Sequence, residues 1–242
     1  MKKILCLTLA LLFITSLMSA HALAQDNADE GCDPYADIPI NITPIFDDIS
    51  YDYSADLGDI QKLAADSLHT IPRHESVVLG ITHYNPVLEF HATLIKKTMS
   101  SGLYCAKVKS VNARIGYTNI TVYIAREFPE GTCEFDHVMT HEQKHVTVNR
   151  ELLEEFTPLI EERLKDYFRL YGTFQVEQPN FADSLINEKV KAVFSEMAQK
   201  MLLENQRRQK LVDSPEEYAK NNTACNGNVA KIARQFVMNR GN

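Results

Sequence analysis

Residues 133–172 read CEFDHVMTHEQKHVTVNRELLEEFTPLIEERLKDYFRLYG, and this stretch decides the fold. Its apolar residues recur every three or four positions, which is the spacing of one face of an α-helix. Glu134 and Asp136 fall in the first turn, where carboxylates suit the positive end of the helix dipole. We expect Pro158 to kink or break this helix, because proline has no amide hydrogen for the helical ladder.

Two more helices are predicted on the same grounds. The longer one spans about residues 182–211, with Pro179 before it and Ser214-Pro215 after it, which are residue types that begin and end helices. A shorter one is expected around LGDIQKLAADSL, residues 57–68. The second half of the chain is therefore mainly helical.

The region before the long helix, residues 76–127, has the composition of strands, because it is rich in β-branched and aromatic residues. Its segments are SVVLGITHY (76–84), PVLEFHATLIKK (86–97), GLYCAKVKSVNARIGY (102–117) and NITVYIAREF (119–128). Turn-forming pairs separate them, namely Asn85-Pro86, Ser101-Gly102 and Thr118-Asn119. Short connections favour antiparallel neighbours, so the sequence predicts a meander of about four strands. Strands followed by helices indicate the α+β class.

The chain begins with the pattern of a bacterial-type secretory signal peptide. Lys2 and Lys3 precede an apolar run that ends near Met18, and small residues follow up to Ala24. We expect cleavage after Ala24, hence export to the periplasm or the extracellular space. Residues 25–40 are predicted to be a mobile acidic lead-in, and residues 41–242 one α+β domain. We expect no membrane span in the mature chain.

Cysteine content and charge narrow the function further. The mature chain keeps four cysteines, an even number in an exported protein, so two disulfides are expected, with three connectivities open. These cysteines are Cys32, Cys105, Cys133 and Cys225. No pair has the close C-x-x-C spacing of a thiolate zinc site. The net charge is −7 without a dense basic cluster, so nucleic acid is not an expected partner.

Three histidines recur every fourth position at the start of the long helix. At about 100° per residue, His137, His141 and His145 form one narrow row that Val148 and Leu152 continue, so the row faces the interior or a cleft. Imidazoles one turn apart can both direct a nitrogen to a point about 2 Å from each, as zinc requires. The ring of His137 lies roughly 12 Å along the axis from that of His145, so we expect His137 to be a hydrogen-bonding neighbour or a core residue and not a ligand.

Glu142 follows the second histidine and stands beside the row, where its carboxylate can reach a water held on a metal. HEQKH, residues 141–145, matches the H-E-x-x-H pattern, and here the sequence resembles the zincin metallopeptidases. Residues 119–128 resemble the edge strand that in zincins runs along the cleft and pairs with an extended substrate. Residues 103–153 also resemble a group of uncharacterised secreted bacterial proteins regarded as zinc proteases.

By this resemblance His141 and His145 are ligands of Zn²⁺ and Glu142 is the catalytic base. No histidine follows His145, so a carboxylate is expected as the third ligand. Glu204 is the first candidate, because it stands at the same helical angle as Ile186 on an apolar stripe and a buried carboxylate needs a partner. An ion pair with Arg208 is the alternative explanation of Glu204. The further candidates are Asp213, Glu217, Tyr218 and Glu188.

The sequence thus predicts an exported zinc-dependent hydrolase. It would be a metallopeptidase that cleaves a peptide or protein substrate with metal-bound water, and Glu142 would act as general base. The alternative is a non-catalytic binding or scaffold protein of the cell envelope, in which a metal is structural or absent.

Overall fold

The computed structural model describes residues 32, 38–66 and 77–240. The signal peptide predicted for residues 1–24 lies outside these residues, as does most of the acidic lead-in predicted for residues 25–40. The elements follow in chain order: β1 (Ile40–Phe46), β2 (Ser50–Asp52), α1 (Leu57–Asp66), β3 (Gly80–Thr98), β4 (Tyr104–Ile124), α2 (Cys133–Tyr171), β5 (Thr173–Val176), α3 (Pro179–Val212), α4 (Pro215–Asn221), the 3₁₀ helix η1 (Ala224–Gly227) and α5 (Asn228–Arg240).

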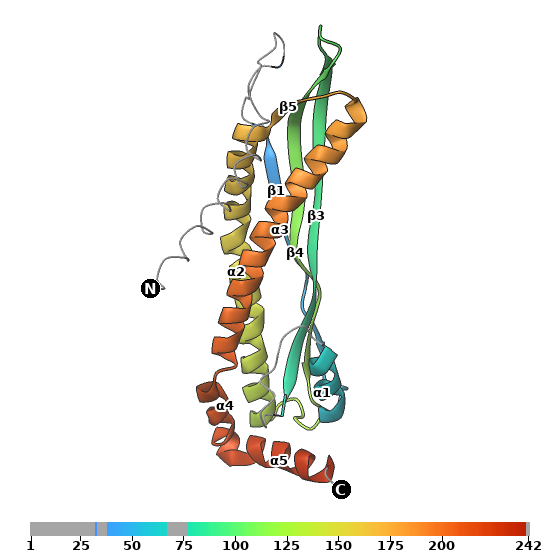
Figure 1. Cartoon of the computed structure of the whole chain (residues 1–242). Helices are drawn as coiled ribbons and strands as arrows, with labels where there is room; N and C mark the ends of the chain where they lie inside the picture. The colour runs from blue at the N-terminus through green and yellow to red at the C-terminus, as the bar shows by residue number, and fades with distance from the viewer. Residues whose placement is uncertain (1–31, 33–37, 67–76, 241–242) are drawn as a thin grey trace, which may run out of the picture.

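The α+β class and the three predicted helices are confirmed, but the meander of about four strands is wrong. β3 and β4 are two long antiparallel strands, and each contains most of two of the four predicted segments (Figure 1). Asn85 pairs with Thr118 and Pro86 with Tyr117, beside a register shift between His83 and Asn85. The two predicted turns, Asn85-Pro86 and Thr118-Asn119, therefore lie opposite each other in the hairpin. They form a bulge, and both strands continue beyond it.

β4 lies in the middle of a mixed sheet of five strands. β1 and β2 pair with it in parallel, whereas β3 and β5 pair with it antiparallel. Residues 119–128 are predicted by resemblance to be an edge strand, but Thr121–Tyr123 within them pair with β3 on one side and with β2 on the other. That prediction is therefore wrong. β1, β2, β3 and β5 each pair only with β4 among the described residues, so β3 has no strand partner on its other edge there.

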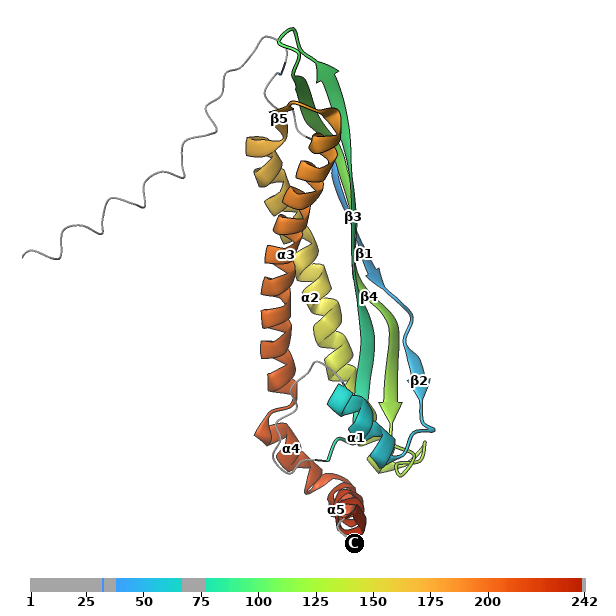
Figure 2. The ribbon, with the colours of Figure 1, turned by 45° about the vertical axis from the view of Figure 1, so that its right-hand side comes forward.

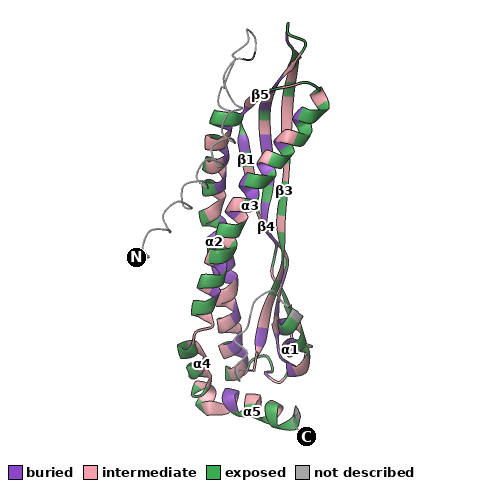
Figure 3. Cartoon of the chain, viewed as in Figure 1, coloured by how far each residue is buried: buried purple, intermediate pink, exposed green. Residues whose placement is uncertain are grey.

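The long helices α2 and α3 lie side by side over one face of the sheet (Figure 2). Pro158 does not break α2, which continues to Tyr171. Buried side chains form a main core between these helices and the sheet, and a second core at the end where α2 begins (Figure 3). The second core includes Leu57 and Ile60 of α1 with Phe135 and Val138 of α2, so it fixes the first turns of α2 against the sheet.

Two disulfides are present, as the even cysteine count predicted. They join Cys32 to Cys105 and Cys133 to Cys225, and they indicate an oxidising compartment. Among the described helices, none has both the length and the apolar character needed to cross a membrane.

Candidate metal centre

The start of α2 places the histidine row. Thr132 caps the helix, since its hydroxyl oxygen accepts a hydrogen bond of 3.2 Å from the amide of Phe135. Phe135 and Val138 then bury against the sheet, which turns His141 and His145 toward a cavity that the beginning of β3 also lines. Both imidazoles are half-buried at its wall.

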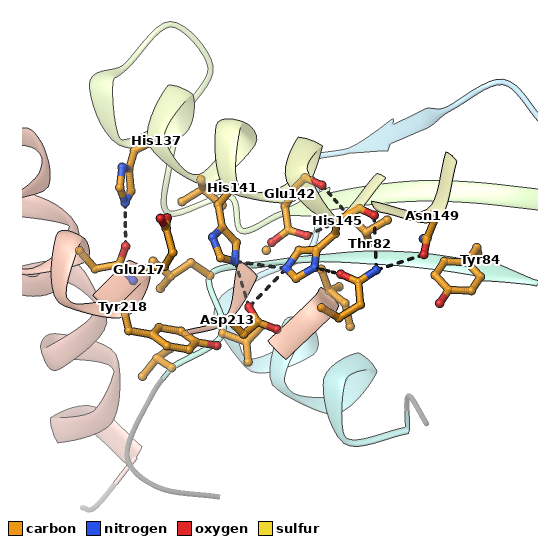
Figure 4. A pocket seen from close by; sticks show the side chains of 18 residues that line it. Thr82, Tyr84, His137, His141, Glu142, His145, Asn149, Asp213, Glu217 and Tyr218 are labelled. Atoms are coloured by element: carbon orange, nitrogen blue, oxygen red, sulfur yellow. Dashed lines mark hydrogen bonds and ion pairs between the residues drawn. The ribbon is translucent and has the colours of Figure 1, made fainter. Parts of the chain in front are cut away.

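The third donor is Asp213, which ends α3 as its C-cap residue and directly precedes Ser214, the N-cap of α4. Its Oδ1 lies 3.1 Å from His141 Nε2 and 3.3 Å from His145 Nε2, and the two Nε2 atoms lie 3.2 Å apart (Figure 4). A tetrahedral zinc ion with bonds of about 2.0 Å separates its ligand atoms by about 3.3 Å. The three donors therefore form one triangular face of the required size.

The donor set also has suitable chemistry for a metal. Two neutral imidazole nitrogens with one carboxylate oxygen leave a fourth tetrahedral position open, as catalytic zinc sites do. His141, His145 and Asp213 form the one such group of close potential ligands in the described part of the chain, and they could hold a metal ion.

Glu204, the first candidate for the third ligand, is not near the histidines, so that prediction is wrong. It is paired with Arg207 and Arg208, and Arg208 also contacts Glu155. The alternative explanation, an ion pair with Arg208, is confirmed. Hydrogen bonds from these two arginines hold the pKa of Glu204 down at about 2, as expected for a surface ion pair.

The remaining candidates also lie outside the set of donors. Glu217 pairs with Lys144 and Lys220, and Glu188 is exposed on α3. The ring of Tyr218 lies 6.5 Å from the ring of His141, with its hydroxyl end pointing toward Asp213 (Figure 4). Tyr218 thus borders the centre.

Glu142 is more deeply buried than the histidines, with 3 % of its surface exposed. The hydroxyl of Thr82 on β3 donates a 2.9 Å hydrogen bond to its Oε2. A side chain at Gly80 would come within 3.1 Å of Glu142 Cγ and 2.8 Å of the Tyr123 carbonyl, so the glycine allows α2 to approach the sheet at this point. Burial raises the pKa of Glu142, although His145, His141 and Thr82 act in the opposite direction.

A hydrogen bond on the far side of His145 sets its tautomer. Gln209 uses its amide NH₂ to donate to Asn149 Oδ1 at 3.1 Å, so its Oε1 accepts from the Nδ1–H of His145. The Nε2 lone pair is then free for a metal. Asn205 also donates to Asn149, at 2.7 Å, and these three amide side chains are buried together between α2 and α3.

We predict that Gln209→Leu weakens zinc binding on the order of tenfold, because the acceptor that orients His145 is lost. Asn205→Leu is the matched control, since it removes an amide of the same buried group that has no contact with His145. Competition titration with a chromogenic chelator measures both affinities. Equal affinities of the two variants would show that Gln209 has no orienting role.

Without a metal, His145 and Asp213 stabilise each other's charged forms. Burial alone lowers the pKa of His145, but the hydrogen bond to Asp213 and the charges of Glu142 and Asp213 raise it to about 9. Burial acts to raise the pKa of Asp213, yet hydrogen bonds from His141 and His145 hold it well below its usual range.

The metal-free protein should therefore lose the contribution of His145 to its stability as the pH rises from about 6.5 through about 9. The contribution of Asp213 is lost only as the pH falls toward its depressed pKa. A metal ion bound at this site would displace the proton of His145, so if the ion is zinc we expect its apparent affinity to rise by up to about tenfold per pH unit below pH 9. The unfolding temperature is measured with zinc and with a chelator at each pH in this range, and the difference between the two should grow with pH. A difference that does not depend on pH would show that His145 is not a zinc ligand.

The segment of residues 213–228, which we call the C-terminal clasp, is fastened along the first turns of α2. Besides the Asp213 contacts, its attachments are the disulfide Cys133–Cys225, His137 donating to Asn221 at 2.7 Å, Lys144 to Glu217 at 2.6 Å, and Asn228 to Glu134 at 2.7 Å. His137 is thus a hydrogen-bonding neighbour, as expected. The clasp holds the third donor in place from its C-terminal side.

Removing the Cys133–Cys225 disulfide with serine at both positions should loosen the clasp. We expect a loss of about 2 kcal/mol of stability, because this bond closes a long loop, and about tenfold weaker zinc binding. Chemical denaturation and chelator competition measure the two effects. Serine at Cys32 and Cys105 is the control, since that disulfide joins β4 to the chain before β1 and does not contact the clasp. Equal losses of zinc affinity in both variants would refute the role of the clasp.

No protein-family model, curated protein or solved structure matches this chain significantly.

Proposed function

We propose that this chain is an exported zinc-dependent peptidase with His141, His145 and Asp213 as ligands and Glu142 as general base. The observation that carries the proposal is the triangle of Nε2, Nε2 and Oδ1 atoms with sides of 3.1 to 3.3 Å, with a buried carboxylate beside it. A purely structural site would have no use for an uncoordinated buried acid at this position. The periplasm or the extracellular space would be its location.

Zinc in a three-ligand site with an open position lowers the pKa of water and polarises a substrate carbonyl. Glu142 is suited to take the proton from the attacking water, because its raised pKa brings it closer to the working pH of a general base. Thr82 donates a hydrogen bond to one carboxylate oxygen of Glu142, and the other oxygen would take the proton. Glu142 then carries the proton to the leaving amine.

β3 is the strand suited to hold a peptide. Among the described residues it pairs only with β4, and its Gly80, Ile81 and Thr82 line the cavity of the centre. An extended peptide can add to such a free edge through main-chain hydrogen bonds. Specificity would then come from side-chain pockets along the cavity.

The proposal is tested by digestion of an unfolded protein such as reduced, alkylated casein with the purified mature chain. We expect fragments with zinc, none after removal of zinc by a chelator, and restored cleavage after zinc is added back. One zinc per chain with no cleavage of any unfolded substrate would favour the scaffold alternative with a structural metal.

A further inference from the structure

A second hollow adjoins the cavity of the metal centre, and the two share Val77, Leu79, Tyr218 and Asn221 in their walls. We call this hollow the distal groove. Its far wall is α5, which contributes Val229, Ala233, Arg234 and Val237. A chain lying along the start of β3 at the metal centre would therefore continue into the distal groove.

α5 is a fixed wall and not a loose end. Its Ile232 and Phe236 pack against the core that also holds the first turns of α2. The disulfide of Cys225 lies just before it in the chain and joins it to the start of α2. Because Ile232 and Phe236 face the core, Ala233 and Val237 are left to face the groove.

The two hollows differ in charge. The cavity of the metal centre is lined by the acids Glu142, Asp213 and Glu217. The described lining of the distal groove has no acid, and its one cation is Arg234, between aliphatic side chains. A ligand that spans both is therefore favoured when it is apolar in the groove and negatively charged next to Arg234.

We infer that the distal groove is a specificity subsite for a peptide in which an apolar side chain is followed by a carboxylate. The carboxylate comes from an acidic side chain or from the free C-terminus of the peptide. This inference rests on the proposed peptidase function, since it names the substrate class of that site. Seating a leucine side chain in place of glycine should strengthen binding about tenfold, and the exposed pairing with Arg234 should add about threefold.

Binding is measured by fluorescence anisotropy of labelled peptides on the zinc-loaded Glu142→Gln protein, which separates recognition from cleavage. Amidated peptides that contain Leu-Glu, Gly-Glu or Leu-Lys compare the two features. Peptides that end in leucine as the free acid or as the amide test the C-terminus as the source of charge. We expect Leu-Glu to bind tightest of the amidated set, and the free-acid and amide pair to show which carboxylate is used.

Variants of the groove locate the effect. Ala233→Phe should fill the groove and remove the preference for leucine, and Arg234→Glu should reverse the preference for glutamate over lysine. Lys231→Glu is the matched control, because it makes the same charge change on an exposed position of α5 outside the groove lining. Zinc content should be unchanged in all three.

The outcomes separate this inference from the proposed function. If the unsubstituted protein cleaves peptides without preferring leucine followed by a carboxylate, the inference is wrong and the proposed peptidase stands. The same holds if Ala233→Phe and Arg234→Glu leave peptide binding unchanged. If these peptides bind preferentially but the unsubstituted protein cleaves none of them, the inference is supported and the peptidase function is refuted. Failure of every peptide to bind, or a dimer in sedimentation that Ala233→Phe dissociates, overturns the inference.

Discussion

Glu142→Gln should leave about one zinc per chain and lower peptide hydrolysis by about 10²- to 10⁴-fold, the range for loss of a positioned general base. Glutamine keeps the shape of the side chain, and its amide oxygen can still accept the hydrogen bond from Thr82. It cannot take a proton from the attacking water. Elemental analysis and the rate of casein digestion, measured on the same preparation, give the two readouts.

Glu204→Gln provides the matched control for this substitution. The change is the same, but Glu204 lies on the surface in an ion pair with Arg207 and Arg208. We expect it to keep both zinc and activity. If Glu142→Gln hydrolyses casein as fast as the unsubstituted protein, Glu142 is not the general base.

The second large effect is expected for Asp213→Ala, which should weaken zinc binding by about 10²- to 10³-fold. Structural zinc sites with four ligands bind with about 10–16 kcal/mol, so one ligand accounts for about 3 kcal/mol. Two imidazoles would remain, and no other His, Cys, Asp or Glu of the described residues belongs to this group of close donors. Chelator competition measures the loss, and hydrolysis at limiting zinc should fall in parallel.

Glu217→Ala is the control for Asp213→Ala, because Glu217 lines the same cavity but is held by Lys144 and Lys220. We expect its zinc affinity to stay within a few-fold of that of the unsubstituted protein. If both variants bind zinc as tightly as the parent, the carboxylate of Asp213 is not a ligand.

The helices could be predicted because their signals are local. The spacing of apolar residues in residues 133–172 and the flanking prolines of α3 depend only on neighbours in the chain. The antiparallel turn at Ser101-Gly102 could be predicted, but the full length of β3 and β4 could not, because Asn85-Pro86 and Thr118-Asn119 have the composition of turns. Only their pairing with each other, across 33 residues for Asn85 and Thr118, turns them into a bulge.

The sequence indicates the pair of histidines, but its helical periodicity favours Glu204 over Asp213 as the third ligand for a geometric reason. Following one angle from Ile186 along a straight helix leads to Glu204. The line of α3 that faces α2 and the sheet advances instead in steps of four, which rotate it by about 40° per step. These positions are Val193, Met197, Met201, Asn205, Gln209 and Asp213, and Met201, Asn205 and Gln209 are at least partly buried. Extending the four-residue series would have found the third donor.

The clasp was beyond prediction, because its contacts join residues far apart in the sequence. Four cysteines allow three connectivities, and only the fold brings Cys133 to Cys225. The same applies to Lys144 and Glu217, whose residue types are common on any helix surface. The sequence therefore predicts the part of the site on α2 and a carboxylate as third ligand, with Asp213 as a candidate after Glu204.

X-ray diffraction from crystals of the zinc-loaded protein, collected at the zinc absorption edge, tests the metal centre most directly. The account predicts one strong anomalous peak about 2.0–2.2 Å from the Nε2 atoms of His141 and His145 and from a carboxylate oxygen of Asp213. A peak bound by other side chains, or imidazoles turned away from each other with no peak between them, would contradict it.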